Sequence, residues 1–305
     1  YYMRKSSKMF YSKVLLFGEY SVIKHSMALS IPYTLFEGKL EFRRDNRGNI
    51  DLELKSFCNY LKIQKEKERL GFSIDLNSFS FDVGQGLYFD STIPQGFGVG
   101  SSGAVCAAIY DAYAQILPTK TNNEFKNDFS LMEGHFHGSS SGIDPLISYL
   151  NEPILNRNNG EVSEVKLPHF SPGNGGIFLL NTGRARRTEP LVNLFLEKCK
   201  SKDFSKKIES ELLKINDNCI TSLLEGDIET LYRNYESLSF FQFDEFTPMI
   251  PNLYRDLWRD GLLYKKYFLK LCGAGGGGFL LGMTKNFDEA EELLKNYEIR
   301  PLIRF

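Results

Sequence analysis

A glycine-rich turn near residue 100 has the composition of an anion-binding loop. Its glycines lack the Cβ atoms that would block a phosphate, and successive backbone N–H groups can form a concave nest. The turn leads into a predicted helix, residues 103–117, whose N-terminus adds about half a positive charge. Alternatively, the glycines only make a tight turn and a serine caps the helix. The segment reads Pro94-Gln95-Gly96-Phe97-Gly98-Val99-Gly100-Ser101-Ser102-Gly103.

Neither of two common nucleotide-binding patterns fits the chain. The Walker A pattern GxxxxGK[ST] is absent from the turn, which also lacks the third glycine of the dinucleotide fingerprint. Residues 273–278 match GxGxxG by letter, but a strand-like segment follows them, so the Rossmann context fails. Such a glycine run marks either a bulged hairpin or a place where a backbone or ligand comes very close.

Charged side chains complete a set that suits phosphoryl transfer. Lys13 leads into a predicted strand that ends at Gly18-Glu19, and Glu133 and Asp144 lie on either side of a Ser/Gly turn. Taken singly, they read as a surface lysine, a solvated helix residue and a helix N-cap. Taken together, a lysine, a phosphate-binding turn, a carboxylate pair and a late glycine run favour phosphoryl transfer.

In this order, the segments resemble the motifs of the GHMP kinase superfamily, and most closely those of the mevalonate kinases. The family patterns are a first motif ending in Gly-Glu, the phosphate-binding PxGxGxGSS, GxPSGID with a glutamate eleven residues before its aspartate, a strand-end Arg-Ser-Thr, and KxTGAGGGG. The likeness spans nearly the whole chain. The corresponding segments are Lys13-x4-Gly18-Glu19 and residues 94–102, 138–144, 181–188 and 270–278.

The resemblance implies a two-domain α+β fold with the active site in the cleft between the domains. An ATP-binding N-terminal domain, like ribosomal protein S5 domain 2, would span residues 1–172, and a ferredoxin-like C-terminal domain residues 173–305. The implied reaction uses ATP and Mg²⁺ to phosphorylate the primary hydroxyl of mevalonate. Its product, 5-phosphomevalonate, belongs to isoprenoid biosynthesis.

Residue roles follow from the same resemblance. Asp144 would accept the proton of the substrate alcohol, while Lys13 lowers the pKa of that alcohol and steadies Asp144 and the phosphate. Ser102 and Glu133 would hold Mg²⁺, which prefers such oxygen ligands. The implied ATP-binding residues are Pro94, Gly96, Gly98, Gly100, Ser101, Ser102, Gly275 and Gly276. The implied substrate-binding residues are Glu19, Tyr20, Arg186 and Thr188.

The chain departs from the family pattern at several positions. Tyr20 replaces a histidine, Arg187 a serine, Ser140 a proline and Cys272 a hydroxyl residue. Gly-Glu-Tyr also occurs in phosphomevalonate-kinase-like members, and extra cationic residues would accommodate a phosphorylated acceptor. Three functions therefore stay open: a mevalonate kinase, a kinase of phosphomevalonate or another small alcohol, and a silent nucleotide-binding sensor. The joint presence of the lysine, glutamate and aspartate argues against the sensor.

Hydrophobic periodicity predicts the elements that position these residues. In the N-terminal half, strands are predicted at 13–18, 29–35, 40–44, 50–54 and 79–82. Helices are predicted at 103–117 and 129–137 and from Pro145, a loop at 119–128, and either a solvated helix or a mobile flap at 56–69. A stretch rich in Asn, Gly and Pro, residues 156–175, marks the domain boundary. Beyond it we expect strands at 176–182, 270–283 and 299–305 and helices at 190–200, 204–224, 228–238 and 287–297.

Composition excludes several classes of protein. With 305 residues, 42% of them hydrophobic and 25% charged, the chain is globular and long enough for two domains. Its 37 basic and 38 acidic residues leave a formal charge of −1, which argues against nucleic acid and membrane surfaces as partners. No apolar stretch approaches the roughly 20 residues of a membrane span, and no signal peptide is recognisable.

Cysteine and histidine usage is consistent with a cytoplasmic protein without structural metal. The five cysteines, an odd number without a CxxC pair, read as buried thiols in a reducing compartment. His135 and His137 lie two apart with no third ligand at a sensible spacing, which argues against zinc. The expected partner is a small-molecule substrate, and a homodimer stays open.

Overall fold

The computed structural model describes residues 8–43, 50–171, 173–185 and 189–305. The chain forms two compact units. Unit 1 comprises residues 1–14, 31–94 and 99–154, and unit 2 comprises residues 15–30, 95–98 and 155–305.

A five-stranded sheet contains the first candidate residue, Lys13. Its strands are β1 (Phe10–Phe17), β2 (Ala28–Phe42), β3 (Leu87–Ser91), β4 (Ile154–Asn156) and β5 (Val162–Glu164). Their order is β1-β2-β4-β5, and β3 pairs antiparallel with β2 from Gly38 opposite Ser91 to Phe42 opposite Leu87. Strand β1 is largely buried, so the sheet holds the Lys13 backbone rigidly.

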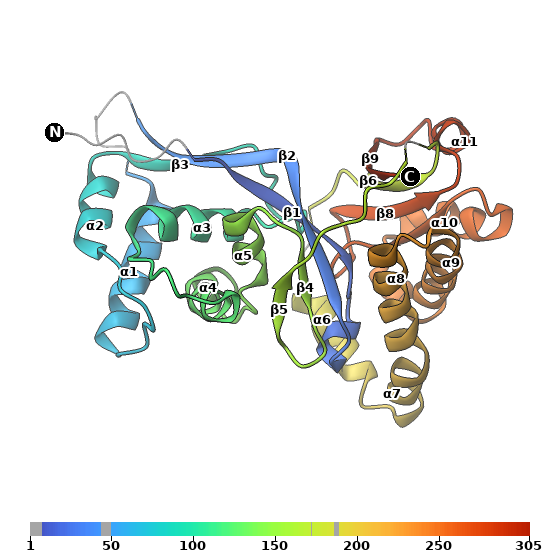
Figure 1. The fold of residues 1–305 in the computed structure, drawn as a ribbon, viewed down its shortest axis with the longest axis horizontal. Helices are drawn as coiled ribbons and strands as arrows, with labels where there is room; N and C mark the ends of the chain where they lie inside the picture. The colour runs from blue at the N-terminus through green and yellow to red at the C-terminus, as the bar shows by residue number, and fades with distance from the viewer. Residues whose placement is uncertain (1–7, 44–49, 172, 186–188) are drawn as a thin grey trace. The chain divides into compact units, whose positions relative to one another are not determined.

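The helices of unit 1 are α1 (Leu52–Glu66), α2 (Leu76–Gly84), α3 (Ser101–Tyr113), α4 (Asn122–His137) and α5 (Ile143–Leu150). Helices α3, α4 and α5 pack on one another (Figure 1). Helix α3 is rich in small residues and buried along most of its length, which lets its neighbours approach closely. This packing brings the ends of three helices to one place.

Several sequence predictions for unit 1 were wrong because capping side chains outweigh strand-like composition. The predicted strands 50–54 and 79–82 are helical, since Asp51 and Asp75 cap α1 and α2 through Leu54 N–H and Ser78 N–H. The predicted loop 119–128 is mostly helix, because Thr121 and Glu124 form a capping box. The predicted strands 29–35 and 40–44 form a single strand, β2.

Unit 2 is built on a four-stranded antiparallel sheet of order β7-β8-β6-β9. Its strands are β6 (Gly176–Asn181), β7 (Phe268–Leu271), β8 (Phe279–Thr284) and β9 (Ile299–Arg304). Every residue of β7 and β8 is buried. The predicted strand 270–283 is therefore a hairpin, with the glycine run as the connection between β7 and β8.

Helices α9 and α10 pack against β7 of this sheet. The sequence predictions missed α10, although Tyr254, Trp258 and Gly261 recur at helical spacing along its buried face. A short π-helical turn, Ile208–Leu212, interrupts the predicted helix 204–224. The helical segments of unit 2 are η1 (Ser21–Lys24), α6 (Glu189–Lys198), α7 (Lys202–Lys207), η2 (Ile208–Leu212), α8 (Leu213–Glu225), α9 (Ile228–Glu245), η3 (Thr247–Met249), α10 (Asn252–Tyr264) and α11 (Phe287–Leu293).

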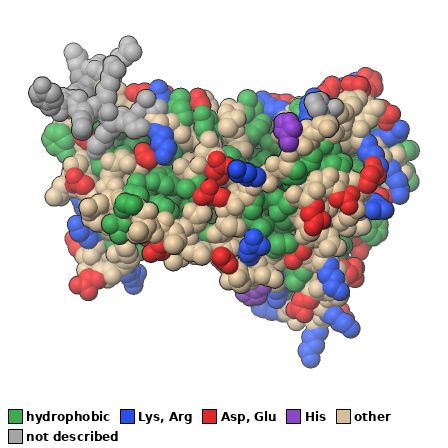
Figure 2. Space-filling view, in the orientation of Figure 1, with side chains coloured by type: hydrophobic (Ala, Val, Ile, Leu, Met, Phe, Trp, Pro, Cys, Tyr) green, Lys and Arg blue, Asp and Glu red, His purple; other side chains and the backbone are tan. Residues whose placement is uncertain are grey.

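The surface and the cysteines agree with the composition. Acidic and basic side chains are interspersed on the face drawn in Figure 2. All five cysteines are free thiols, and four are buried as predicted, whereas Cys199 is partly exposed. Within the described residues, no helix combines the length and apolar character that crossing a membrane requires.

Candidate active site

The glycine-rich turn ends at the N-terminus of α3 in a conformation that requires glycine. Gly96, Gly98 and Gly100 have φ angles of 77°, 74° and 82°, in the left-handed region. Gly100 is the N-cap of α3, so no side chain caps the helix. The serine-cap alternative therefore does not apply, and the first backbone N–H groups of α3 form a site suited to anions.

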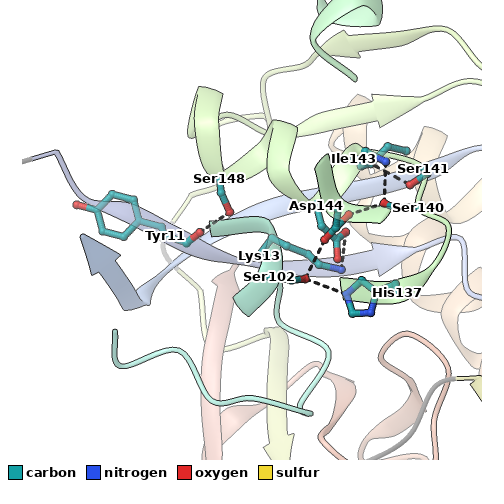
Figure 3. Close-up of polar contacts among 11 residues, drawn as sticks. Tyr11, Lys13, Ser102, His137, Ser140, Ser141, Ile143, Asp144 and Ser148 are labelled. Carbon is teal, nitrogen blue, oxygen red and sulfur yellow. Dashed lines mark hydrogen bonds and ion pairs between the residues drawn. The ribbon is translucent and has the colours of Figure 1, made fainter. Parts of the chain in front are cut away.

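Lys13 lies directly beside this turn and forms an ion pair with Asp144. Its backbone N–H donates to the carbonyl of Val99 at 2.9 Å, and a Cβ on Gly100 would lie 2.9 Å from the Lys13 side chain. The Lys13 Nζ is 2.9 Å from Asp144 Oδ1 (Figure 3). The lysine side chain is 9% exposed and the aspartate 36%, so the pair is open to solvent on the carboxylate side.

Two glycines allow Asp144 to reach this position at the start of α5. A Cβ on Gly103 of α3 would lie 2.8 Å from the carbonyl carbon of Asp144. A Cβ on Gly142, the N-cap of α5, would lie 2.0 Å from the carbonyl oxygen of Lys126. Neither position accepts a larger side chain without movement, so close helix packing fixes the carboxylate.

Glu133 of α4 is the buried carboxylate of the same cluster. Ser102 donates to its Oε1 at 2.9 Å, and Ser140 donates to its Oε2. Burial, reinforced by the negative charge of Asp144, raises the pKa of Glu133 to about 7, while the two serines and Lys13 oppose this shift. The carboxylate is only 3% exposed. A cation bound beside Glu133 would therefore stabilise the charged form of this buried carboxylate.

His137 belongs to the site, although its spacing from His135 in the sequence argued only against zinc and assigned it no role. Its Nε2 lies 2.9 Å from the Ser102 hydroxyl (Figure 3). His135 instead stacks on Phe57, with ring centroids 5.3 Å apart. The missed signal is the spacing of Glu133 and His137, four residues apart on α4, which places both on one helix face.

The donor set of this cluster suits magnesium. In the described part of the chain, no group of three or more His, Cys, Asp and Glu residues is arranged to hold a metal ion. Mg²⁺ needs fewer ligands from the protein, since it is usually bound through one or two carboxylates together with phosphate and water oxygens. Ser102 and Glu133 provide two such oxygen donors beside the anion-binding end of α3. The residues present therefore fit Mg²⁺ bound with a nucleotide.

Unit 2 contains a second lysine–carboxylate pair, which is sealed. Lys270 Nζ lies 2.5 Å from Glu19 Oε1 and donates to the carbonyl of Leu271 at 2.7 Å. The two side chains are 0% and 1% exposed. Burial raises the pKa of Glu19, although Lys270 and the backbone N–H of Gly273 oppose this shift. The structure places Glu19 inside unit 2 as an anchor of the glycine run.

Tyr20 also contacts this run. Its hydroxyl donates to the carbonyl of Ala274 at 2.5 Å, and its ring packs on Phe195 and Phe246 with centroids 4.8 and 5.1 Å away. Tyr20 is thus buried among aromatic rings. Its hydroxyl is engaged with the backbone of the glycine run.

The glycine run packs tightly against other backbone of unit 2. A Cβ on Gly278 would lie 2.6 Å from the carbonyl oxygen of Phe97, and one on Gly275 would lie 2.5 Å from that of Met249. Gly276 N–H donates to the Met249 carbonyl at 2.7 Å. The close approach of another backbone therefore explains these glycines. Arg186, Arg187 and Thr188 lie outside the described residues.

Comparison with known proteins agrees with this architecture. Residues 59–152 match the family described as GHMP kinases N terminal domain. Over 159 residues, the chain is 30% identical to a mevalonate kinase from Pyrococcus horikoshii, in an alignment that covers 45% of this chain and 47% of that protein. The chain thus matches about half the length of this relative.

Two solved structures share the fold across nearly their whole length. The L. major mevalonate kinase, solved in complex with R-mevalonate, has a TM-score of 0.64 and 16% identity, covering 96% of this chain and 92% of that one. The Streptococcus pneumoniae phosphomevalonate kinase, solved in complex with phosphomevalonate and AMPPNP, has the same TM-score and identity, covering 97% and 99%. The fold is thus the α+β fold of these kinases, as predicted. Within this fold, residues 59–152 are similar to the N-terminal domain of the GHMP kinases.

Proposed function

We propose that this protein is an ATP-dependent kinase that phosphorylates the primary hydroxyl of mevalonate. The observation that carries the proposal is the open ion pair between Lys13 and Asp144, built beside the N-terminus of α3. A general base must be ionised and reachable by the hydroxyl that it deprotonates. Asp144 is reachable because its side chain is 36% exposed, and its ion pair with Lys13 at 2.9 Å holds the carboxylate beside the N-terminus of α3.

Residues of unit 1 have separate roles in the proposed phosphoryl transfer. The N–H groups at the start of α3 and the preceding turn bind the phosphates of ATP. Asp144 takes the proton from the acceptor hydroxyl as the oxygen attacks the γ-phosphorus, and ADP leaves. Lys13 stabilises the negative charge on the acceptor oxygen and the phosphoryl group. Ser102 and Glu133 would hold Mg²⁺, which would neutralise charge on the phosphate oxygens.

Residues of unit 2 have supporting roles in this proposal. Glu19 and Tyr20 fix the glycine run, which includes Gly275 and Gly276, rather than meeting the substrate through exposed polar atoms. Arg186 and Thr188 are proposed from the sequence resemblance to hold the carboxylate and hydroxyl of mevalonate, because an arginine fork matches a carboxylate.

Phosphomevalonate is the second candidate acceptor. Tyr20 stands where the mevalonate kinase pattern has a histidine, and its hydroxyl is engaged with Ala274. A structure with the same TM-score of 0.64 is that of a phosphomevalonate kinase. The tyrosine favours an acceptor site that differs from that of the mevalonate kinases, whereas the fold is shared with both kinases and does not distinguish the two acceptors.

The test measures ADP release with Mg-ATP against mevalonate, phosphomevalonate, homoserine and galactose, with the phosphorylated product identified by mass. We expect turnover of mevalonate and a mass increase of one phosphoryl group. Turnover of phosphomevalonate alone would overturn mevalonate as the acceptor and support phosphomevalonate in its place. Absence of turnover on every acceptor by a protein that still binds ATP would overturn the enzyme proposal.

A further inference from the structure

We propose that His137 and Ser140 are positioning residues that orient the two candidate magnesium ligands, Ser102 and Glu133. The inference deepens the proposed function and rests on it. Neither residue is needed to touch the nucleotide or the acceptor. Each contacts one ligand through a hydrogen bond and fixes the direction in which its oxygen lone pairs point.

The first step of the argument is the single proton of the Ser102 hydroxyl. That oxygen has two polar neighbours at 2.9 Å, Glu133 Oε1 and His137 Nε2. Without metal, the proton can be donated to the carboxylate. When Ser102 and Glu133 both turn lone pairs toward one cation, the proton can no longer point at Glu133. The His137 ring nitrogen is then the acceptor in place, and accepting that proton aims the Ser102 lone pair at the metal.

The second step concerns the other oxygen of Glu133. Ser140 donates to Oε2, and this serine is itself fixed because Gly142 N–H donates to its hydroxyl at 3.0 Å. Ser130 of α4 donates to the Ser140 carbonyl at 2.5 Å. Oε2 is therefore held by a rigid turn, and Oε1 is kept on the side of Ser102. At this position the mevalonate kinase pattern has proline, which has no hydroxyl to donate.

The exposed position of His137 allows a role in orienting Ser102 to be distinguished from a role in folding. It is the last residue of α4, just before the C-cap Gly138, and its side chain is exposed. Its replacement removes little buried area, so the protein should keep its stability. A loss of metal binding in such a variant would therefore reflect a change in the orientation of Ser102 and not a loss of folding.

The experiment titrates Mn²⁺, as a spectroscopic substitute for Mg²⁺, into the protein with a non-hydrolysable ATP analogue and follows free Mn²⁺ by EPR. The variants are His137→Leu and Ser140→Ala, with the conservative variants His137→Gln and Ser140→Thr. The matched controls are His169→Leu, an exposed histidine elsewhere, and Ser141→Ala, the next serine of the turn. Binding of the analogue in EDTA and the melting temperature are measured for each.

We expect the Mn²⁺ dissociation constant to rise about 10- to 100-fold in His137→Leu and Ser140→Ala, as for other residues that orient metal ligands. His137→Gln and Ser140→Thr keep an acceptor and a donor, so their losses should be smaller. Analogue binding in EDTA should be unchanged. Wild-type Mn²⁺ affinity in His137→Leu and Ser140→Ala would overturn this inference alone. A wild-type protein that binds neither the analogue nor Mn²⁺ would overturn the proposed function with it.

Discussion

Two of the lysine–carboxylate pairs in the described part of the chain, one in each unit, have similar lengths and opposite surroundings. In unit 1, Lys13 and Asp144 are 2.9 Å apart, and the carboxylate is 36% exposed. In unit 2, Lys270 and Glu19 are 2.5 Å apart, and both side chains are sealed from solvent. Each pair joins a lysine to a carboxylate, and all four residues lie in segments whose sequence resembles the kinase motifs. The sequence therefore does not distinguish the two pairs.

The surroundings separate the two roles. An open pair leaves one side of the carboxylate for another molecule, and it can change partners during a reaction. A sealed pair cannot do so, because exposing either charge to a substrate would require rearranging the core around it. Glu19 and Lys270 instead hold the backbone at Gly273 and Leu271. The difference predicts that the unit 1 pair governs activity and the unit 2 pair governs stability.

The largest stability effect should come from breaking the sealed pair. Either Glu19→Gln or Lys270→Met leaves a buried charge without its partner, which typically costs about 3 to 5 kcal/mol. The double variant should lose less than the sum of the two single losses, because it removes both charges. Urea unfolding of the four proteins measures this cycle. Additive losses, or single losses below about 1 kcal/mol, would contradict the sealed role.

Glu133→Gln should change how stability depends on pH. The folded protein holds the Glu133 proton with a pKa of about 7, above its usual 4.5. The wild type therefore loses stability from this group as pH rises from 4.5 to 7, by about 3 kcal/mol in total. Glu133→Gln has no such loss, so its free energy of unfolding relative to wild type should increase over that range. Glu66→Gln, an exposed change in the same unit, should show no comparable trend.

Gly103→Ala tests how closely packing fixes the open pair. The added Cβ would lie 2.8 Å from the Asp144 backbone, so α5 must shift. We expect a loss of about 1 to 3 kcal/mol and a lower kcat, since Asp144 moves with α5. Gly84→Ala is the matched control, because its Cβ would meet nothing within 4 Å. Equal behaviour of the two variants in unfolding and kinetics would show that Gly103 does not hold Asp144.

The smallest effect should come from an exposed pair in unit 2. Lys285 and Glu229 are 2.8 Å apart, like Lys13 and Asp144, but both side chains are more than half exposed. Glu229→Gln should change the free energy of unfolding by less than about 1 kcal/mol, because water and salt screen the pair. A loss as large as that of Glu19→Gln would mean that burial does not distinguish these pairs.

The sequence predicted local features better than contacts between distant segments. Helix α3 and strand β6 followed from hydrophobic patterning, and the motifs predicted Lys13 and Asp144 as site residues, which the structure brings within 2.9 Å. The partner of Glu19 was not predictable, because Lys270 lies 251 residues away and only the fold brings them together. The spacing of Glu133 and His137 on α4 places them on one helix face, but only the fold shows that His137 reaches Ser102, 35 residues earlier. Capping side chains, by contrast, were local signals that outweighed composition.

The most direct test measures kcat and the free energy of unfolding in Asp144→Asn beside Glu19→Gln. For Asp144→Asn we predict a fall in kcat of at least about 100-fold, because the general base is lost. Its stability should change by less than about 2 kcal/mol, because the aspartate is 36% exposed. Glu19→Gln should show the larger loss of stability. An Asp144→Asn protein with wild-type kcat would contradict the assignment of the open pair to catalysis.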